Sequence, residues 1–69
     1  MKHIDTDTLI KGLKDFRISK GYTLQDIGDY CGYTPQYIFK FEAGKANSMD
    51  LLLKYIQLGF RVEDYIKEI

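Results

Sequence analysis

Apolar residues recur every three or four positions along this chain, and no stretch alternates like a strand bounded by hairpin turns. The periodicity predicts five short helices, at about 6–20, 23–31, 34–43, 48–58 and 62–69. Residues 1–5 precede the first helix and are expected to be disordered. The sequence therefore predicts a single all-α domain spanning residues 1–69.

Residues typical of helix ends stand at the predicted boundaries. The expected N-terminal caps are Asp5, Thr6 or Asp7 for the first helix, and Thr23, Thr34 and Ser48 for the next three. Asp26 follows Thr23 at the third position, which resembles a capping box. Pro35 follows Thr34 and favours the first helical position. Glycine follows the first four helices, at Gly21, Gly32, Gly44 and Gly59.

The fourth predicted helix carries a clear apolar stripe, and the fifth repeats it. Met49, Leu52, Leu53 and Ile56 stand at i, i+3, i+4 and i+7, as in a helix that packs one face on a core. The last segment has Val62, Tyr65, Ile66 and Ile69 at similar spacing. In the third helix, Ile38 and Phe41 form the apolar pair, so Phe39 is expected to point outward.

The segment of about 23–43 has the form of a helix-turn-helix. Only Gly32-Tyr33 separates its two helices, and so tight a turn forces them to cross steeply. The crossing needs a small residue on the first helix. Gly28 supplies it, although glycine costs about 1 kcal/mol against alanine inside a helix. The second helix of such a motif can enter the major groove of DNA.

An ordered set of motifs extends this pattern from about Leu9 to Ile66. They are Leu13-x-x-Phe16-Arg17, Gly21-Tyr22-Thr23-Leu24-Gln25-Asp26-Ile27-Gly28, Gly32-Tyr33-Thr34, Tyr37-Ile38, Phe41-Glu42-Ala43-Gly44-Lys45, Ser48-Met49-Asp50-x-Leu52-Leu53 and Leu58-Gly59-Phe60. In these motifs the chain resembles the Cro/C1-type (XRE) helix-turn-helix domains of phage repressors and related small bacterial regulators. The resemblance implies a compact five-helix, lambda-repressor-like DNA-binding domain, with helices 2 and 3 as the helix-turn-helix and 34–43 as the recognition helix.

The chain departs from the family pattern inside the motif. Leu24 stands where the family usually has a glutamine that helps to anchor the DNA backbone and the recognition helix. Gly28 replaces a usual alanine. The recognition helix is bulkier and more apolar than is typical, because it contains Pro35, Tyr37 and Phe39.

The resemblance implies that exposed residues of the recognition helix face base edges. Gln36 and Lys40 are the first base-reading candidates, since glutamine can pair with adenine and lysine can donate to guanine. Pro35 and Phe39 are further candidates, because each can touch a thymine methyl group. The alternatives are ordinary exposed polar residues at 36 and 40, and a protein-binding or internally buried role for Phe39.

Six residues are candidates for contacts to DNA phosphates: Thr23, Thr34, Tyr37, Lys45, Asn47 and Arg17. Thr23 and Thr34 lie at helix starts, where free N–H groups attract anions, although simple capping also explains both. The resemblance further implies a partly buried structural ion pair between Arg17 and Glu42. Loss of one partner of a buried ion pair is expected to cost several kcal/mol.

The charge balance keeps a second function open. Ten basic and ten acidic residues give a net charge of zero, whereas DNA-binding domains are often strongly basic. The alternative is a helix-turn-helix module that acts through protein–protein contacts, as an antirepressor or repressor partner, with little or no DNA binding. The aromatic recognition helix would then hold the protein partner.

Other functional classes have little support in the sequence. The single cysteine forms no internal disulfide, and no Cys/His cluster predicts a metal site or a cofactor. No nucleophile-and-base set indicates an enzyme, and no small-molecule ligand is expected. The longest strongly apolar run is only Leu51 to Leu53, so no membrane span and a cytoplasmic location are expected.

These observations together predict a sequence-specific, Cro- or repressor-like transcriptional regulator of a phage or mobile element. Such a protein is expected to bind operator DNA as a homodimer, with two half-sites one helical turn apart. The last predicted helix is the expected dimer interface, through Tyr65, Ile66 and Ile69.

Overall fold

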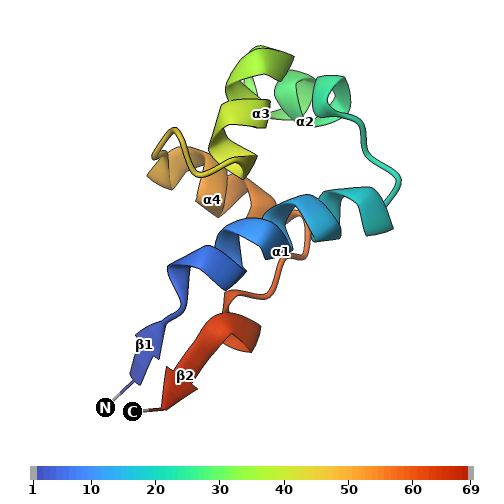
Figure 1. Ribbon diagram of the computed structural model, residues 1–69. Helices are drawn as coiled ribbons and strands as arrows, with labels where there is room; N and C mark the ends of the chain where they lie inside the picture. Colours follow the sequence, from blue (N-terminus) through green and yellow to red (C-terminus); the bar gives the residue numbers. More distant parts are fainter. Residues whose placement is uncertain (1, 69) are drawn as a thin grey trace.

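The computed structural model describes residues 2–68 (Figure 1). Its elements are β1 (Lys2–Ile4), α1 (Thr6–Ser19), α2 (Leu24–Cys31), α3 (Pro35–Glu42), α4 (Met49–Gln57), the 3-10 helix η1 (Val62–Tyr65) and β2 (Ile66–Glu68). The all-α class is confirmed, with four α-helices in the described residues instead of five. The helices α2 and α3 lie at one end of the molecule and the short strand pair lies at the other (Figure 1).

The four α-helices begin where capping residues predict. Asp5, Thr23, Thr34 and Ser48 each accept a hydrogen bond from a backbone N–H of the first turn. The capping box of α2 is complete, because the Asp26 N–H donates to Thr23 Oγ1 at 3.0 Å and the Thr23 N–H donates to Asp26 Oδ2 at 2.9 Å. Local sequence therefore fixes the starts of all four α-helices.

Gly28 allows the turn between α2 and α3 to fold back on α2. A Cβ atom at residue 28 would lie 2.5 Å from the carbonyl oxygen of Tyr33. The Gly28 carbonyl accepts hydrogen bonds from the N–H groups of Gly32 and Tyr33, at 2.8 and 2.9 Å. The close approach expected at Gly28 is present, and its partner is the backbone of the turn.

The core is assembled from all four α-helices and the segment that follows α4. Its buried hydrophobic residues are Leu13, Ile27, Ile38, Phe41, Leu51, Tyr55 and Phe60. The ring centroids of Phe41 and Tyr55 are 5.7 Å apart, which joins α3 to α4. The recognition helix is thus held from inside by α1 and α4, and its opposite face remains free for function.

The predicted core face of α4 is largely wrong. Leu51 and Tyr55 are fully buried, whereas Met49, Leu53 and Ile56 are exposed by 72, 50 and 40%. Leucine and isoleucine occur on both sides of this nine-residue helix, so the apolar periodicity fits two opposite faces. The exposed trio, called the α4 stripe below, lies on the face of α4 opposite to Leu51 and Tyr55.

The predicted helix at 62–69 is also wrong. The 3-10 helix η1 ends at Tyr65, and β2 then pairs antiparallel with β1 in the register Lys2↔Glu68, His3↔Lys67 and Ile4↔Ile66. Residues 2–4, expected to be disordered, are thus in a strand. An eight-residue segment is too short to sustain a helix without packing, and β-branched residues such as Ile66 favour extended backbone.

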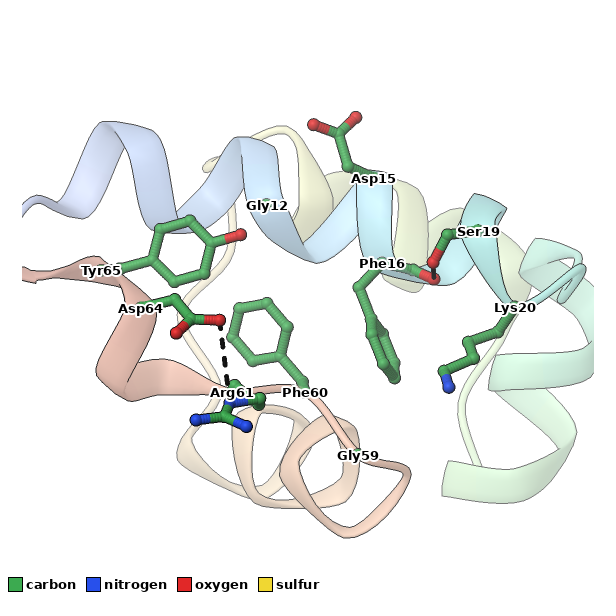
Figure 2. A pocket seen from close by; sticks show the side chains of 10 residues that line it. All are labelled: Gly12, Asp15, Phe16, Ser19, Lys20, Gly59, Phe60, Arg61, Asp64 and Tyr65. Atoms are coloured by element: carbon green, nitrogen blue, oxygen red, sulfur yellow. Dashed lines mark hydrogen bonds and ion pairs between the residues drawn. The ribbon is translucent and has the colours of Figure 1, made fainter.

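Tyr65 packs inside the chain rather than on a free helix face. Its ring stacks on Phe60 with centroids 5.5 Å apart and an interplanar angle of 18° (Figure 2). Its hydroxyl end lies against Gly12 of α1, where a Cβ atom would collide with it. Gly12 is buried and leaves room for Tyr65, a contact that the sequence pattern did not predict.

Candidate nucleic-acid interface

The outer face of α3 carries the predicted base-reading side chains. Ile38 and Phe41 point into the core, with exposed fractions of 0 and 7%. Gln36, Phe39 and Lys40 are exposed, and Phe39 has 58% of its surface accessible. The prediction that Phe39 points outward is confirmed.

A hollow of about 440 Å³ brings these side chains together. It is lined by Leu24, Pro35, Gln36, Phe39, Lys40 and Lys45. All four base-reading candidates therefore share one surface with Lys45, a phosphate candidate. None of the described residues that line this hollow is acidic.

Leu24 and Lys14 belong to this surface, although the sequence did not mark them as site residues. Leu24 and Phe39 line the first hollow and also a neighbouring one of about 300 Å³, which Lys14 lines as well. Lys14 stands three residues before Arg17 on α1, and both line the second hollow. That helical spacing was the signal that could have placed Lys14 beside Arg17.

The phosphate candidates are spread over several elements. The hydroxyl groups of Thr23 and Thr34 act as helix caps, and Thr34 Oγ1 accepts from the Tyr37 N–H at 3.2 Å. The first turn of α2 contains the carboxylate of Asp26, whereas the first turn of α3 contains no acidic residue. The N-terminus of α3 is consequently the more favourable of the two for a phosphate.

Two other phosphate candidates lie outside the hollow at α3. Asn47 is exposed but lines a different hollow, between α1 and α4. Tyr37 is half-buried, and its ring stacks on Tyr33 at a centroid distance of 5.0 Å. Of the six phosphate candidates, Lys45 is the one that lines the hollow at α3.

The ion pair that the resemblance implied is present between α1 and α3. Arg17 Nε lies 2.8 Å from Glu42 Oε2 and 3.1 Å from Oε1, and the two side chains are 11 and 4% exposed. Arg17 also donates from a terminal nitrogen to the Tyr22 carbonyl at 3.0 Å. Its guanidinium is therefore engaged inside the domain, and a phosphate contact by Arg17 stays a prediction.

Tyr55 completes this buried polar cluster. Its hydroxyl donates to Glu42 Oε2 at 2.6 Å. Burial, followed by the hydrogen bond to Glu42, raises the pKa of the Tyr55 hydroxyl well above its usual range. The proton therefore stays on Tyr55, and the donor that the Glu42 carboxylate needs is always present at neutral pH.

The balanced total charge conceals an uneven local distribution. Lys14, Lys40 and Lys45 are exposed around the two hollows at α3. The only acidic residue described in the lining of either hollow is Glu42, whose carboxylate is paired with Arg17. The surface of α3 is thus locally basic although the whole chain is neutral.

Other kinds of site find no support in residues 2–68. No group of three or more His, Cys, Asp or Glu side chains in this range is arranged to hold a metal ion. None of the described helices combines the length and the hydrophobicity required to cross a bilayer.

Comparison with known proteins agrees with this geometry. Neither the curated proteins nor the solved structures contain a significant match to the chain. A family model described as helix-turn-helix matches residues 13–58, which is more than half of the chain and includes α2, the turn and α3 in full. With the tight turn at Gly28, the outward face of α3 and this match, the chain belongs to the Cro/C1-type (XRE) helix-turn-helix family.

Proposed function

We propose that this protein is a sequence-specific transcriptional regulator that binds operator DNA by placing α3 in the major groove. The family is one of DNA-binding regulatory domains. The observation that carries the proposal is the shared hollow at α3, which combines Gln36, Phe39 and Lys40 with Lys45 and contains no acidic residue in its described lining. We propose that it acts in the bacterial cytoplasm in the manner of a repressor, by occupying its operator.

Each polar residue of this surface has a distinct role in the proposal. Gln36 pairs with an adenine edge, and Lys40 donates to the acceptors of guanine. Lys45 and the N-terminus of α3 contact phosphates on either side of the groove. Thr34 contributes as the cap of that helix start.

We further propose that the protein binds as a homodimer through the α4 stripe. In the interface expected from the sequence, Tyr65 packs on Phe60, Ile66 is 38% exposed, and Ile69 lies outside the described residues. The α4 stripe is more exposed, and α4 lies close to α3 (Figure 1). Contact through the distant strand end would instead place the two recognition helices at the outer ends of the assembly.

An NMR titration with generic duplex DNA tests DNA binding without knowledge of the operator. Non-specific binding depends mainly on phosphate charge, so it is strong at low salt and is lost at high salt. We expect salt-sensitive shifts at residues 34–40 and 44–48. Absence of shifts at low salt would contradict DNA binding.

A protein-binding module is the second candidate function, because Phe39 exposes 58% of its surface in a chain with zero net charge. In that case Phe39→Ala abolishes binding of the protein partner, and the affinity of the wild-type protein for that partner changes little with salt. A partner retained by Phe39→Ala would contradict this candidate.

A further inference from the structure

We propose that Leu24, Pro35 and Phe39 form an apolar receptor for the 5-methyl group of thymine in the major groove. This inference rests on the proposed function and specifies what part of the operator the surface reads. It assigns a direct role to Leu24, which replaces the polar residue usual in the family.

The three side chains lie on one surface and are supplied by two helices. Leu24 is the first residue of α2, and Pro35 and Phe39 belong to the first and second turns of α3. All three line the hollow of about 440 Å³, and Phe39 and Leu24 continue into the neighbouring hollow. The turn that connects α2 to α3 packs closely on Gly28, and Leu24 at the start of α2 lines the same hollow as Pro35 and Phe39.

Phe39 has no aromatic neighbour in the described part of the chain. The ring pairs found within residues 2–68 involve Phe16, Tyr33, Tyr37, Phe41, Tyr55, Phe60 and Tyr65. Phe39 leaves 58% of its surface exposed to water, so only part of its side chain is buried and contributes hydrophobic stabilisation. Its exposed ring face is available to an external apolar group.

The chemistry of the surroundings identifies that group. Lys40 and Lys45 line the same hollow and Lys14 lines the next one, so the charge of the surroundings favours an occupant that is attached to a polyanion. The major groove of DNA presents one aliphatic group, the thymine methyl. Gln36 lies within the same lining and can read the polar edge of an adjacent base.

The test begins with selection of the preferred duplex from a random pool. Each thymine in that duplex is then replaced singly by deoxyuridine, which keeps Watson–Crick pairing and lacks the methyl group. We expect one thymine in each half-site at which the replacement weakens binding about fourfold or more, the effect of removing one buried methyl group.

Variants connect that effect to the protein. Phe39→Ala should weaken binding to the thymine duplex and make thymine and uracil equivalent at the sensitive position. Ile18→Ala is the matched control, because Ile18 is also a large apolar residue that is 57% exposed, on α1. It should leave the thymine-to-uracil ratio unchanged.

The outcomes separate this inference from the function on which it rests. The inference is overturned if the selected duplex binds but no thymine replacement matters, or if Phe39→Ala keeps the same preference for thymine. Failure to bind any duplex at low salt overturns the proposed DNA-binding function itself. Binding of a protein partner that is lost on Phe39→Ala and changes little with salt would likewise replace thymine as the occupant.

Discussion

The hydroxyl group of Tyr55 donates a 2.6 Å hydrogen bond to the carboxylate of Glu42, and both side chains are buried. The bond joins α4 to the end of the recognition helix. Glu42 also receives Arg17 from α1 at 2.8 Å. Three helices therefore meet at one carboxylate, which links the end of α3 to both α1 and α4.

Removal of the Tyr55 hydroxyl should lower stability without opening a large cavity. Tyr55→Phe deletes a hydrogen bond to a buried charge, so we expect the free energy of unfolding to fall by about 1.5–3 kcal/mol. Urea unfolding followed by circular dichroism measures the loss. Tyr33→Phe is the control, because Tyr33 donates to Asp50 at an exposed site and should change stability by less than about 0.5 kcal/mol. Equal losses in the two variants would contradict the prediction.

The raised pKa of Tyr55 predicts a loss of stability in alkali. The folded state holds this proton more tightly than the unfolded chain, whose tyrosine pKa is 10.0. The stabilisation is therefore complete below pH 10 and declines as the pH rises above it.

Tyr55→Phe has no proton to lose at this position. The stability difference between wild type and Tyr55→Phe should stay constant near neutral pH and shrink by about 1.4 kcal/mol per pH unit above pH 10. Urea midpoints measured from pH 7 to 11 give this difference. A difference that is independent of pH throughout would show that Tyr55 titrates normally.

Removal of Arg17 should be more damaging than removal of both partners of the ion pair. Arg17→Met leaves the buried Glu42 carboxylate without its cation, at a cost of about 3–5 kcal/mol. The double variant Arg17→Met/Glu42→Leu removes the uncompensated charge and should recover part of the loss. Thermal unfolding of the single and double variants completes a double-mutant cycle. If the stability losses of the single variants simply add in the double variant, the two residues do not interact.

Lysine substitutions should separate phosphate contacts from base contacts. Lys45→Ala should weaken binding to all duplexes and reduce the slope of log K against log salt by about one, whereas Lys40→Ala should mainly reduce discrimination between sequences. Fluorescence anisotropy with several duplexes at several salt concentrations measures both the salt slope and the discrimination between sequences. Arg61→Ala serves as the control, since Arg61 lies after α4 beside Asp64 (Figure 2) and should not affect DNA. An unchanged slope in Lys45→Ala would remove this residue from the interface.

A charge within the α4 stripe should dissociate the proposed dimer. Leu53 is 50% exposed, so Leu53→Asp should preserve the fold and place two carboxylates in an apolar contact. Sedimentation should then report the monomer mass. Ile66→Asp tests the interface predicted from the sequence and should leave the dimer intact. Dissociation by Ile66→Asp alone would favour the strand end as the interface.

Local signals in the sequence predicted the helix-turn-helix correctly because its boundaries are encoded by adjacent residues. Thr23 with Asp26 and Thr34 with Pro35 specify the starts of α2 and α3. The Arg17–Glu42 pair spans 25 positions, so only the family resemblance indicated it. The role of Tyr55 could not be predicted, because the hydrogen-bond partner of a tyrosine in an apolar helix is set by tertiary structure and not by neighbouring residues.

Periodicity failed where tertiary contacts decide the outcome. Apolar spacing predicts a core position for the α4 stripe, whereas Leu51 and Tyr55 on the other face of α4 are buried and Tyr55 bonds to Glu42. The spacing of the last segment predicts a helix, whereas Tyr65 docks against Gly12 and residues 66–68 pair with residues 2–4. Both errors involve contact partners more than ten residues away in sequence, and helical spacing carries no information about such contacts.

The pairing of β1 with β2 brings Lys2 and Glu68 into register at the end of the molecule remote from α2 and α3 (Figure 1). Polypeptide attached to either terminus therefore emerges at the pole opposite the recognition helix. A fluorescent protein or effector domain fused there leaves the surface of α3 unobstructed. The same proximity lets a short peptide join the two ends, so that the chain can be reopened at an exposed loop as a circular permutant.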